Sequence, residues 1–202
     1  PNSPLAGKIV ANIFMENSTR TRCSFTIATH RLGGNVVDLM GSTASTSKGE
    51  TLIDTALNLE AMGVSGIVVR CSEERGPWDI AQHVGVPVIN AGSGAMAHPT
   101  QGLLDALTLT RYFGTNDLSQ KHIAIVGDIK HSRVARSNII GLQKLGARVT
   151  LVGPEELLPN DIDCNTSSDF DATLSEISAC MMLRVQFERN AKISQDYHEK
   201  YG

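Results

Sequence analysis

Short apolar segments alternate along this chain with longer segments in which apolar residues recur every three or four positions. The first strand-length segment is Ile9–Phe14; Phe25, Ala28 and Leu32 then follow at helical spacing until a Gly-Gly pair interrupts the pattern. The same order of strand and helix continues through most of the sequence. This alternation predicts parallel strands joined by helices, which is the pattern of an α/β fold.

The remaining predicted elements follow the same pattern. Strands are predicted at Asn35–Met40, Val64–Arg70, Val86–Asn90, His122–Val126, Arg148–Val152 and Cys180–Arg184. One helix is predicted around Leu52, Ala56 and Leu59, and a short one near Pro77. A third runs from Pro99 to near Gly114, with Leu103, Leu104 and Leu107 facing inward. A fourth follows the turn Gly127–Arg133 and ends at Leu145, and a fifth is Asp171–Ser178. The segments Ala91–Ala97 and Pro154–Ser168 are predicted to be irregular.

The polar segment Asn116–Lys121 follows a predicted helix and marks a domain boundary. The prediction is therefore an α/β protein of two doubly wound parallel-sheet, Rossmann-like domains, residues 1–117 and 118–202, the second one incomplete. A chain of 202 residues with 41% hydrophobic and only 4% aromatic residues fits aliphatic strands buried between helices.

Charge and composition exclude several classes of function. The formal net charge of -3 argues against a nucleic-acid partner, and the lack of an apolar run near 18 residues or of a signal-peptide pattern argues against a membrane partner. The four cysteines are widely separated and lack metal-site spacing, so neither a zinc site nor a disulfide framework is expected. No other metal and no cofactor is expected either. Reduced thiols predict a cytoplasmic protein.

The segment Phe14–Arg22, with the sequence F-M-E-N-S-T-R-T-R, lies where the first strand gives way to a helix. The first turn of a helix has unpaired backbone N–H groups and the positive end of the helix dipole, and both favour a bound anion. Three hydroxyls and two guanidiniums add further donors there. We interpret this turn as a binding site for a phosphate or a carboxylate.

Further polar groups follow the carboxyl ends of other predicted strands, where open parallel sheets bind ligands. They are Arg70, His98 with Gln101, Arg133 and Arg184. With Ser18–Arg22, five separate segments place such groups after the carboxyl ends of strands. This recurrence predicts a binding site for anions that is shared by two domains.

These segments also carry a resemblance to a known family. The motif F-x-E-x-S-T-R-T-R resembles the carbamoyl-phosphate signature of the aspartate and ornithine carbamoyltransferases, and His98–Gln101 is similar to their H-P-T-Q. Val126–Ser137 resembles V-G-D-x-x-x-x-R-x-x-x-S, and Met182–Arg189 resembles M-x-R-V-Q-x-E-R. The last two motifs favour aspartate as the acceptor, with ornithine as the alternative within the family.

The resemblance implies roles for individual residues. It implies that carbamoyl phosphate is bound by Ser18, Thr19, Arg20, Thr21, Arg70, His98 and Gln101. It implies that aspartate is bound by Lys48, Arg133, Arg184 and Gln186. Arg20, Thr21, His98 and Lys48 would be catalytic, because carbamoyl transfer needs donors to the oxyanion that forms as the amine attacks. The base is not evident, and the departing phosphate remains one alternative.

The resemblance further implies a pyrimidine-biosynthesis enzyme that forms a homotrimer with shared active sites. The segment around Lys48 resembles the loop that family members insert into a neighbouring subunit, and either Ser45 or Ser47 would accompany it. Compared with the family, the chain lacks the terminal helices and a His-Pro-Leu-Pro-Arg segment. It is therefore expected to be truncated at both ends.

Two other classes of function remain to be weighed. A nicotinamide-dependent oxidoreductase would bind pyrophosphate at the Gly127 turn, but G-D-I-K-H-S lacks the repeated glycines of G-x-G-x-x-G. A non-catalytic anion-binding module would keep the arginines but has no need for an oxyanion donor such as His98. Turnover separates this module from an enzyme.

Overall fold

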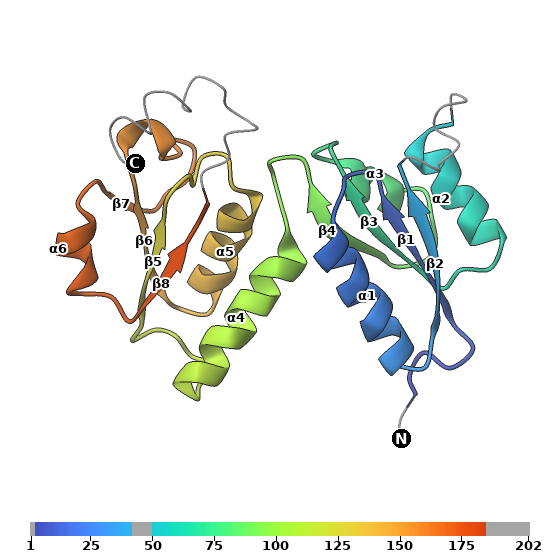
Figure 1. The fold of residues 1–202 in the computed structure, drawn as a ribbon, viewed down its shortest axis with the longest axis horizontal. Coiled ribbons are helices and arrows are strands. Elements are labelled where there is room, and N and C mark those ends of the chain that lie inside the picture. Colours follow the sequence, from blue (N-terminus) through green and yellow to red (C-terminus); the bar gives the residue numbers. More distant parts are fainter. Residues whose placement is uncertain (1–2, 42–49, 185–202) are drawn as a thin grey trace. The chain divides into compact units, whose positions relative to one another are not determined.

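The computed structural model describes residues 3–41 and 50–184 of the chain (Figure 1). It separates into two compact units, residues 1–100 and residues 101–202. Each unit contains one four-stranded sheet in which all the described strand pairs are parallel. The predicted α/β class with two parallel-sheet domains is confirmed.

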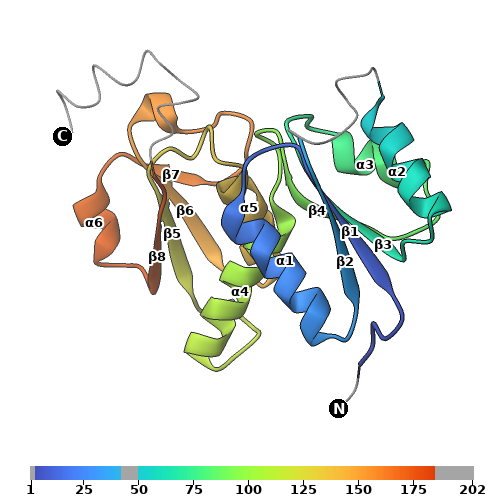
Figure 2. The same ribbon diagram turned by 45° about the vertical axis from the view of Figure 1, so that its right-hand side comes forward.

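The first unit has the strand order β2-β1-β3-β4. Its strands are β1 (Ile9–Phe14), β2 (Asn35–Met40), β3 (Gly66–Cys71) and β4 (Val88–Ser93). Its helices are α1 (Thr19–Arg31), α2 (Leu52–Ala61) and α3 (Gly76–Ala81). Ile13, Ile67 and Val69 pack with residues of α2 and α3 on one face of the sheet, while Phe14 and Val68 pack with Phe25 of α1 on the other. The helices therefore cover both faces, as Figures 1 and 2 show.

The second unit has the strand order β7-β6-β5-β8. Its strands are β5 (His122–Val126), β6 (Arg148–Val152), β7 (Asn165–Ser167) and β8 (Ala179–Met182). Its helices are α4 (Pro99–Phe113), whose first two residues fall in the first unit, α5 (Arg133–Lys144), the single turn η2 (Glu155–Leu157) and α6 (Phe170–Leu174). Leu109 of α4 and Leu142 of α5 pack on one face of the sheet, and Phe170 of α6 packs on the other.

Local sequence explains where several helices begin. Thr51 and Asp54 form a reciprocal capping box at the start of α2, with Oγ1 of Thr51 accepting from the Asp54 N–H at 3.1 Å. Ser132 caps α5 by accepting from the Ala135 N–H, and Asp169 caps α6 in the same way. The caps fix the point at which the chain leaves each preceding loop.

Several local predictions were wrong. Strands β3 and β4 each begin two residues later than predicted, β8 ends at Met182 and not at Arg184, and α6 ends at Leu174 and not at Ser178. Strand β4 continues through Ser93, into the segment predicted to be a loop, and β7 lies within the segment predicted to be irregular. On α4, Leu103, Leu104 and Leu107 are 70%, 56% and 50% exposed rather than buried. Helical spacing identifies an apolar stripe but not the stripe that packs on the sheet.

The predicted domain boundary at 117/118 lies later than the division between the two compact units. Leu109 and Phe113 pack against the core of the second unit, which groups most of α4 with β5–β8. The boundary at 117/118, as a division between two binding domains, stays a prediction. In the described part of the chain, no helix is both long enough and apolar enough to cross a membrane.

Candidate functional site

Parallel pairing brings three predicted segments of the first unit to one sheet edge. Phe14, the last residue of β1, is the register partner of Arg70 in β3, and Cys71 pairs with Ser93 at the end of β4. The Met15 N–H then donates to the Arg70 carbonyl at 2.8 Å. The turn after β1, the end of β3 and the segment after β4 therefore emerge side by side at the carboxyl edge, as expected for a parallel-sheet ligand site.

Arg70 lies at the centre of this edge, with 14% of its side chain exposed. Its Nε is 3.4 Å from Oε2 of Glu16, and its Nη1 donates to the Ala91 carbonyl at 3.3 Å. The same Nη1 lies 3.5 Å from Nε2 of His98. These contacts hold the guanidinium in one plane, and a fixed planar fork suits a phosphate. Sequence reasoning missed the role of Glu16, although it lies within the quoted motif.

His98 is buried, with only 7% of its surface exposed. Because a guanidinium can only donate, Nε2 of His98 accepts from Arg70, and the proton of a neutral ring is then on Nδ1, 3.4 Å from the Thr100 hydroxyl. Arg70 and His98, which are 28 positions apart in sequence, are thus brought together as predicted.

The turn Ser18–Thr21 forms the start of α1. Ser18 is the N-cap, and its hydroxyl makes no capping hydrogen bond to the described residues. The first turn contains no acidic residue, so its N–H groups and dipole remain favourable for an anion. Thr19 and Arg20 are exposed, whereas Arg22, one residue after Thr21, forms an ion pair with Asp38 at 3.6 Å.

Cys71 follows Arg70 directly and is completely buried. Burial, followed by the charge of Glu73, raises the pKa of the Cys71 thiol to about 12. The thiol is therefore neutral at physiological pH and is unsuited to nucleophilic chemistry.

Arg133 of the second unit is the first residue of α5 and only 6% exposed. The turn before it is held by Asp128, which is 1% exposed and accepts from Nδ1 of His131 at 2.8 Å. Gly127 begins this turn with φ +117°, where a Cβ would lie 2.8 Å from the Leu183 carbonyl oxygen. Only glycine allows this approach of the chain after β5 to the chain after β8.

Arg184 follows β8 by two residues and is exposed. The Leu183 N–H donates to the Val126 carbonyl at 2.8 Å, and β5 and β8 are neighbours in register. Arg133 and Arg184 therefore follow the carboxyl ends of two adjacent parallel strands. The sequence-based expectation that both follow strand ends agrees with this arrangement.

Gln101 takes part in a network that the sequence analysis did not predict. Its Nε2 donates to Oδ1 of Asp105 at 2.9 Å, and Nδ2 of Asn138 donates to Oδ2 of the same carboxylate at 2.8 Å. The spacing of four between Gln101 and Asp105 on a helix was the available signal. The partner on α5 had no signal in the sequence.

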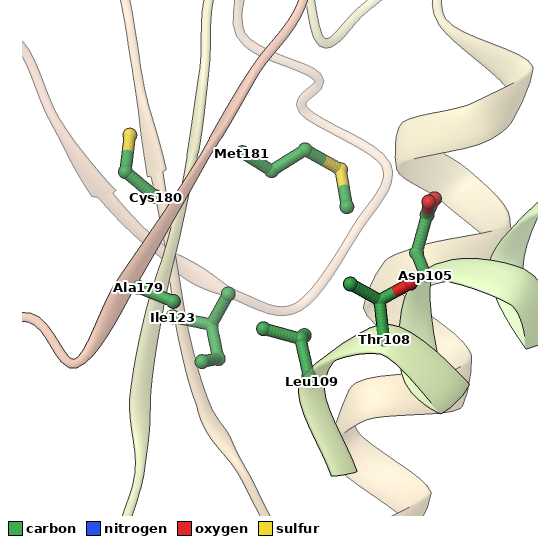
Figure 3. Close-up of a pocket in the computed structure, with 7 residues that line it drawn as sticks. All are labelled: Asp105, Thr108, Leu109, Ile123, Ala179, Cys180 and Met181. Atoms are coloured by element: carbon green, nitrogen blue, oxygen red, sulfur yellow. The ribbon is translucent and has the colours of Figure 1, made fainter. Parts of the chain in front are cut away.

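Lys48 and Gln186, together with Ser45 and Ser47, lie outside the described residues. Within the described ranges, no group of three or more His, Cys, Asp or Glu side chains is arranged to hold a metal ion. A cavity of about 160 Å³ lies between α4 and the strands β5 and β8 (Figure 3). Its lining includes Ile123, the second residue of β5, and Ala179, the first residue of β8, so it does not coincide with the carboxyl edge that carries the predicted residues.

Comparison with known proteins identifies the family of this chain. Residues 1–111 match the family model described as aspartate/ornithine carbamoyltransferase, carbamoyl-P binding domain. The aspartate carbamoyltransferase catalytic subunit of Xanthomonas campestris pv. campestris (strain B100) is 50% identical over 210 residues, which cover 99% of this chain and 66% of that protein. The catalytic subunit from Nocardioides sp. is 48% identical, over 98% of this chain and 65% of that protein.

Solved structures give the same result. The Trypanosoma cruzi aspartate transcarbamoylase in complex with carbamoyl aspartate and phosphate superimposes with a TM-score of 0.84 at 32% identity, covering 94% of this chain and 66% of that one. The catalytic subunit of M. jannaschii aspartate transcarbamoylase also gives 0.84, at 36% identity, covering 99% and 68%. The chain thus spans about two thirds of the length of these relatives, and by its carbamoyl-phosphate motif, its family-model match and its fold it belongs to the aspartate/ornithine carbamoyltransferase family.

Proposed function

We propose that the full-length protein transfers the carbamoyl group of carbamoyl phosphate to the amine of L-aspartate, giving N-carbamoyl-L-aspartate and phosphate. The observation that carries the proposal is the edge of the first unit, where Arg70 is fixed by Glu16 and His98 beside the N-terminus of α1. A rigid guanidinium next to a helix N-terminus is suited to the phosphate of a small acyl phosphate.

Carbamoyl phosphate would be bound through both of its ends. Ser18, Thr19 and Arg70 would contact the phosphate, while Arg20, Thr21 and His98 would donate to the carbonyl oxygen. The exposed side chains of Thr19 and Arg20 in the first turn of α1 are compatible with contact to a ligand. For His98 to donate through Nε2, its contact with Arg70 must be replaced by one to the substrate, and the ring proton must lie on Nε2 instead of Nδ1.

The reaction needs no protein nucleophile. The aspartate amine attacks the carbonyl carbon, a C–N bond forms, and a tetrahedral oxyanion develops on the former carbonyl oxygen. Donors at that oxygen stabilise the oxyanion more than the ground state, which lowers the barrier. The amine must also lose a proton, for which the departing phosphate is the candidate acceptor. The C–O bond to phosphate then breaks, and phosphate leaves with its negative charge countered by Arg70.

Aspartate would be bound by Arg133 and Arg184, with Lys48 and Gln186. Two guanidiniums suit a dicarboxylate because each can hold one carboxylate through two parallel hydrogen bonds. The relatives support aspartate as the acceptor: the Xanthomonas protein is named an aspartate carbamoyltransferase, and one Trypanosoma cruzi structure contains aspartate and phosphate. Residues 1–117 would form the carbamoyl-phosphate domain and residues 118–202 part of the aspartate domain.

A direct test gives the full-length protein carbamoyl phosphate with either aspartate or ornithine and measures phosphate release and the carbamoylated product. We expect turnover with aspartate and little with ornithine. Turnover with ornithine alone would assign the protein to the other branch of the family. Binding of carbamoyl phosphate without turnover of either amino acid would identify a non-catalytic binding module.

We also propose that the protein is a cytoplasmic homotrimer of pyrimidine biosynthesis, in which Lys48 of one subunit completes the site of the next. A dianionic phosphate and a dicarboxylate together require several cations, and a loop donated from each subunit to the next closes into a ring. Mixing inactive Lys48→Ala subunits with inactive Arg20→Ala subunits should restore part of the activity. If subunits exchange and the hybrids stay inactive, Lys48 does not act across subunits.

A further inference from the structure

Asp105 lies on α4, one turn after Gln101, and its two carboxylate oxygens accept from two different amides. Oδ1 accepts from Nε2 of Gln101 at 2.9 Å, and Oδ2 accepts from Nδ2 of Asn138 at 2.8 Å. A carboxylate can only accept, so each amide must turn its NH2 group toward Asp105. The orientation of the Gln101 amide is therefore decided by Asp105.

The far end of this network is rigid. Asn138 is completely buried in α5, and its Nδ2 also donates to the Val134 carbonyl at 3.1 Å. The helices α4 and α5 approach closely at Gly102, where a Cβ would lie 3.3 Å from backbone and side-chain atoms of Ser137. This close approach keeps Asn138 within hydrogen-bonding distance of Asp105.

The surroundings of Asp105 strengthen the effect. Asp105 and Thr108 are the polar side chains that line the cavity beside α4, and the other lining residues are apolar (Figure 3). The Thr108 hydroxyl donates to the Leu104 carbonyl at 2.9 Å and not to this carboxylate. A hydrogen bond to an ionised acceptor is also roughly twice as strong as a neutral one, so the Gln101 amide is held firmly in one orientation.

We propose that Asp105 is a positioning residue that makes Gln101 a hydrogen-bond acceptor toward the substrate, and that this pair selects carbamoyl phosphate over acyl phosphates without an amino group. The inference rests on the proposed function. With its NH2 committed to Asp105, the planar amide of Gln101 directs Oε1 away from the carboxylate. An oxygen in that position accepts from the carbamoyl NH2 group, whereas the methyl group of acetyl phosphate can donate nothing to it.

The test measures the affinities of carbamoyl phosphate and acetyl phosphate for the full-length protein and its variants, by competition. In Asp105→Asn the new side chain faces two donors with only one oxygen, so Gln101 turns its NH2 group toward the substrate. We expect the preference for carbamoyl phosphate to fall about tenfold or more, because two donors then face each other. Thr108→Val, one turn further along the same helix, should leave the preference unchanged.

A second substitution tests the mechanism directly. In Asp105→Asn with Gln101→Glu, the new amide donates to one oxygen of the Glu carboxylate, and the other oxygen accepts from the carbamoyl NH2 group. The net charge is unchanged, but the negative charge moves from position 105 to position 101, which this proposal places against the substrate, and this weakens binding of both acyl phosphates. Their ratio should nevertheless return toward that of the unmodified protein. A role of Asp105 in helix packing alone predicts no such recovery.

The outcomes separate this inference from the proposed function. An unmodified full-length protein that neither binds nor turns over carbamoyl phosphate would overturn the proposed function. An active protein whose preference is unchanged by Asp105→Asn, or not restored by the double substitution, would overturn the positioning role alone. Circular dichroism of each variant checks that the fold is retained.

Discussion

Gly127 provides the sharpest test of how the end of β5 and the end of β8 are arranged. Its φ of +117° is a conformation that side chains rarely adopt, and a Cβ would lie 2.8 Å from the Leu183 carbonyl oxygen. The conformation alone should cost Gly127→Ala roughly 1–2 kcal/mol. The overlap with a backbone atom should add about 1–3 kcal/mol, since the chain at Leu183 must move.

Two other glycines of the same unit separate these terms. At Gly114, φ is +69° and a Cβ would meet no atom of the described residues within 4 Å, so Gly114→Ala should show only the cost of conformation. Gly141 lies inside α5, likewise with no described atom within 4 Å of a Cβ, so Gly141→Ala should stabilise the protein by about 0.5–1 kcal/mol. Denaturant unfolding of the three full-length variants measures these differences.

Gly127→Ala should also affect the binding of one substrate more than that of the other. Movement of Leu183 displaces Arg184, the next residue, so Gly127→Ala should raise the KM for aspartate while the affinity for carbamoyl phosphate is retained. If Gly127→Ala is no more destabilising than Gly114→Ala, Gly127 does not lie as close to the Leu183 carbonyl oxygen as described. If carbamoyl phosphate binding falls as much as aspartate binding, the assignment of Arg184 to aspartate is wrong.

Three further predictions concern single side chains of the full-length protein. Arg20→Ala should lower turnover by roughly 10²-fold or more, as expected for loss of an oxyanion donor, and turnover close to that of the unmodified protein would remove Arg20 from the site. Arg133→Ala and Arg184→Ala should raise the KM for aspartate, whereas Arg70→Ala should weaken carbamoyl phosphate binding. Kinetics and direct binding measure these effects, and equal effects on both substrates would refute the assignment of the two substrates to different arginines. Because burial raises the pKa of Cys71 from 9.0 to about 12, the unfolded thiol ionises first as the pH rises above 9, so stability falls between pH 9 and 12. At pH 10 this loss should be about 1.4 kcal/mol, and Cys71→Ala should show a correspondingly shallower decrease in unfolding free energy from pH 8 to pH 10.

Much of the fold follows from local sequence. The strands β1, β2, β5 and β6 have the predicted bounds, because each is a short, mostly apolar run that is followed by glycine or, after β1, by the polar segment that begins at Glu16. The start of α4 at Pro99 also follows the sequence, since proline suits the first turn of a helix. Segments with weaker periodicity were harder: β7 has three residues, too few to show any pattern.

The sequence by itself determined which residues could bind an anion, because hydroxyls and guanidiniums after a strand have few structural alternatives once they recur at several strand ends. It could not determine which of these side chains meet. The contacts of Arg70 with Glu16 and His98 arise from the register of three parallel strands, and the network of Gln101, Asp105 and Asn138 arises from the close packing of α4 on α5. Both depend on interactions between residues about 30 to 50 positions apart, or on helix faces that only packing selects, so the tertiary structure decided them.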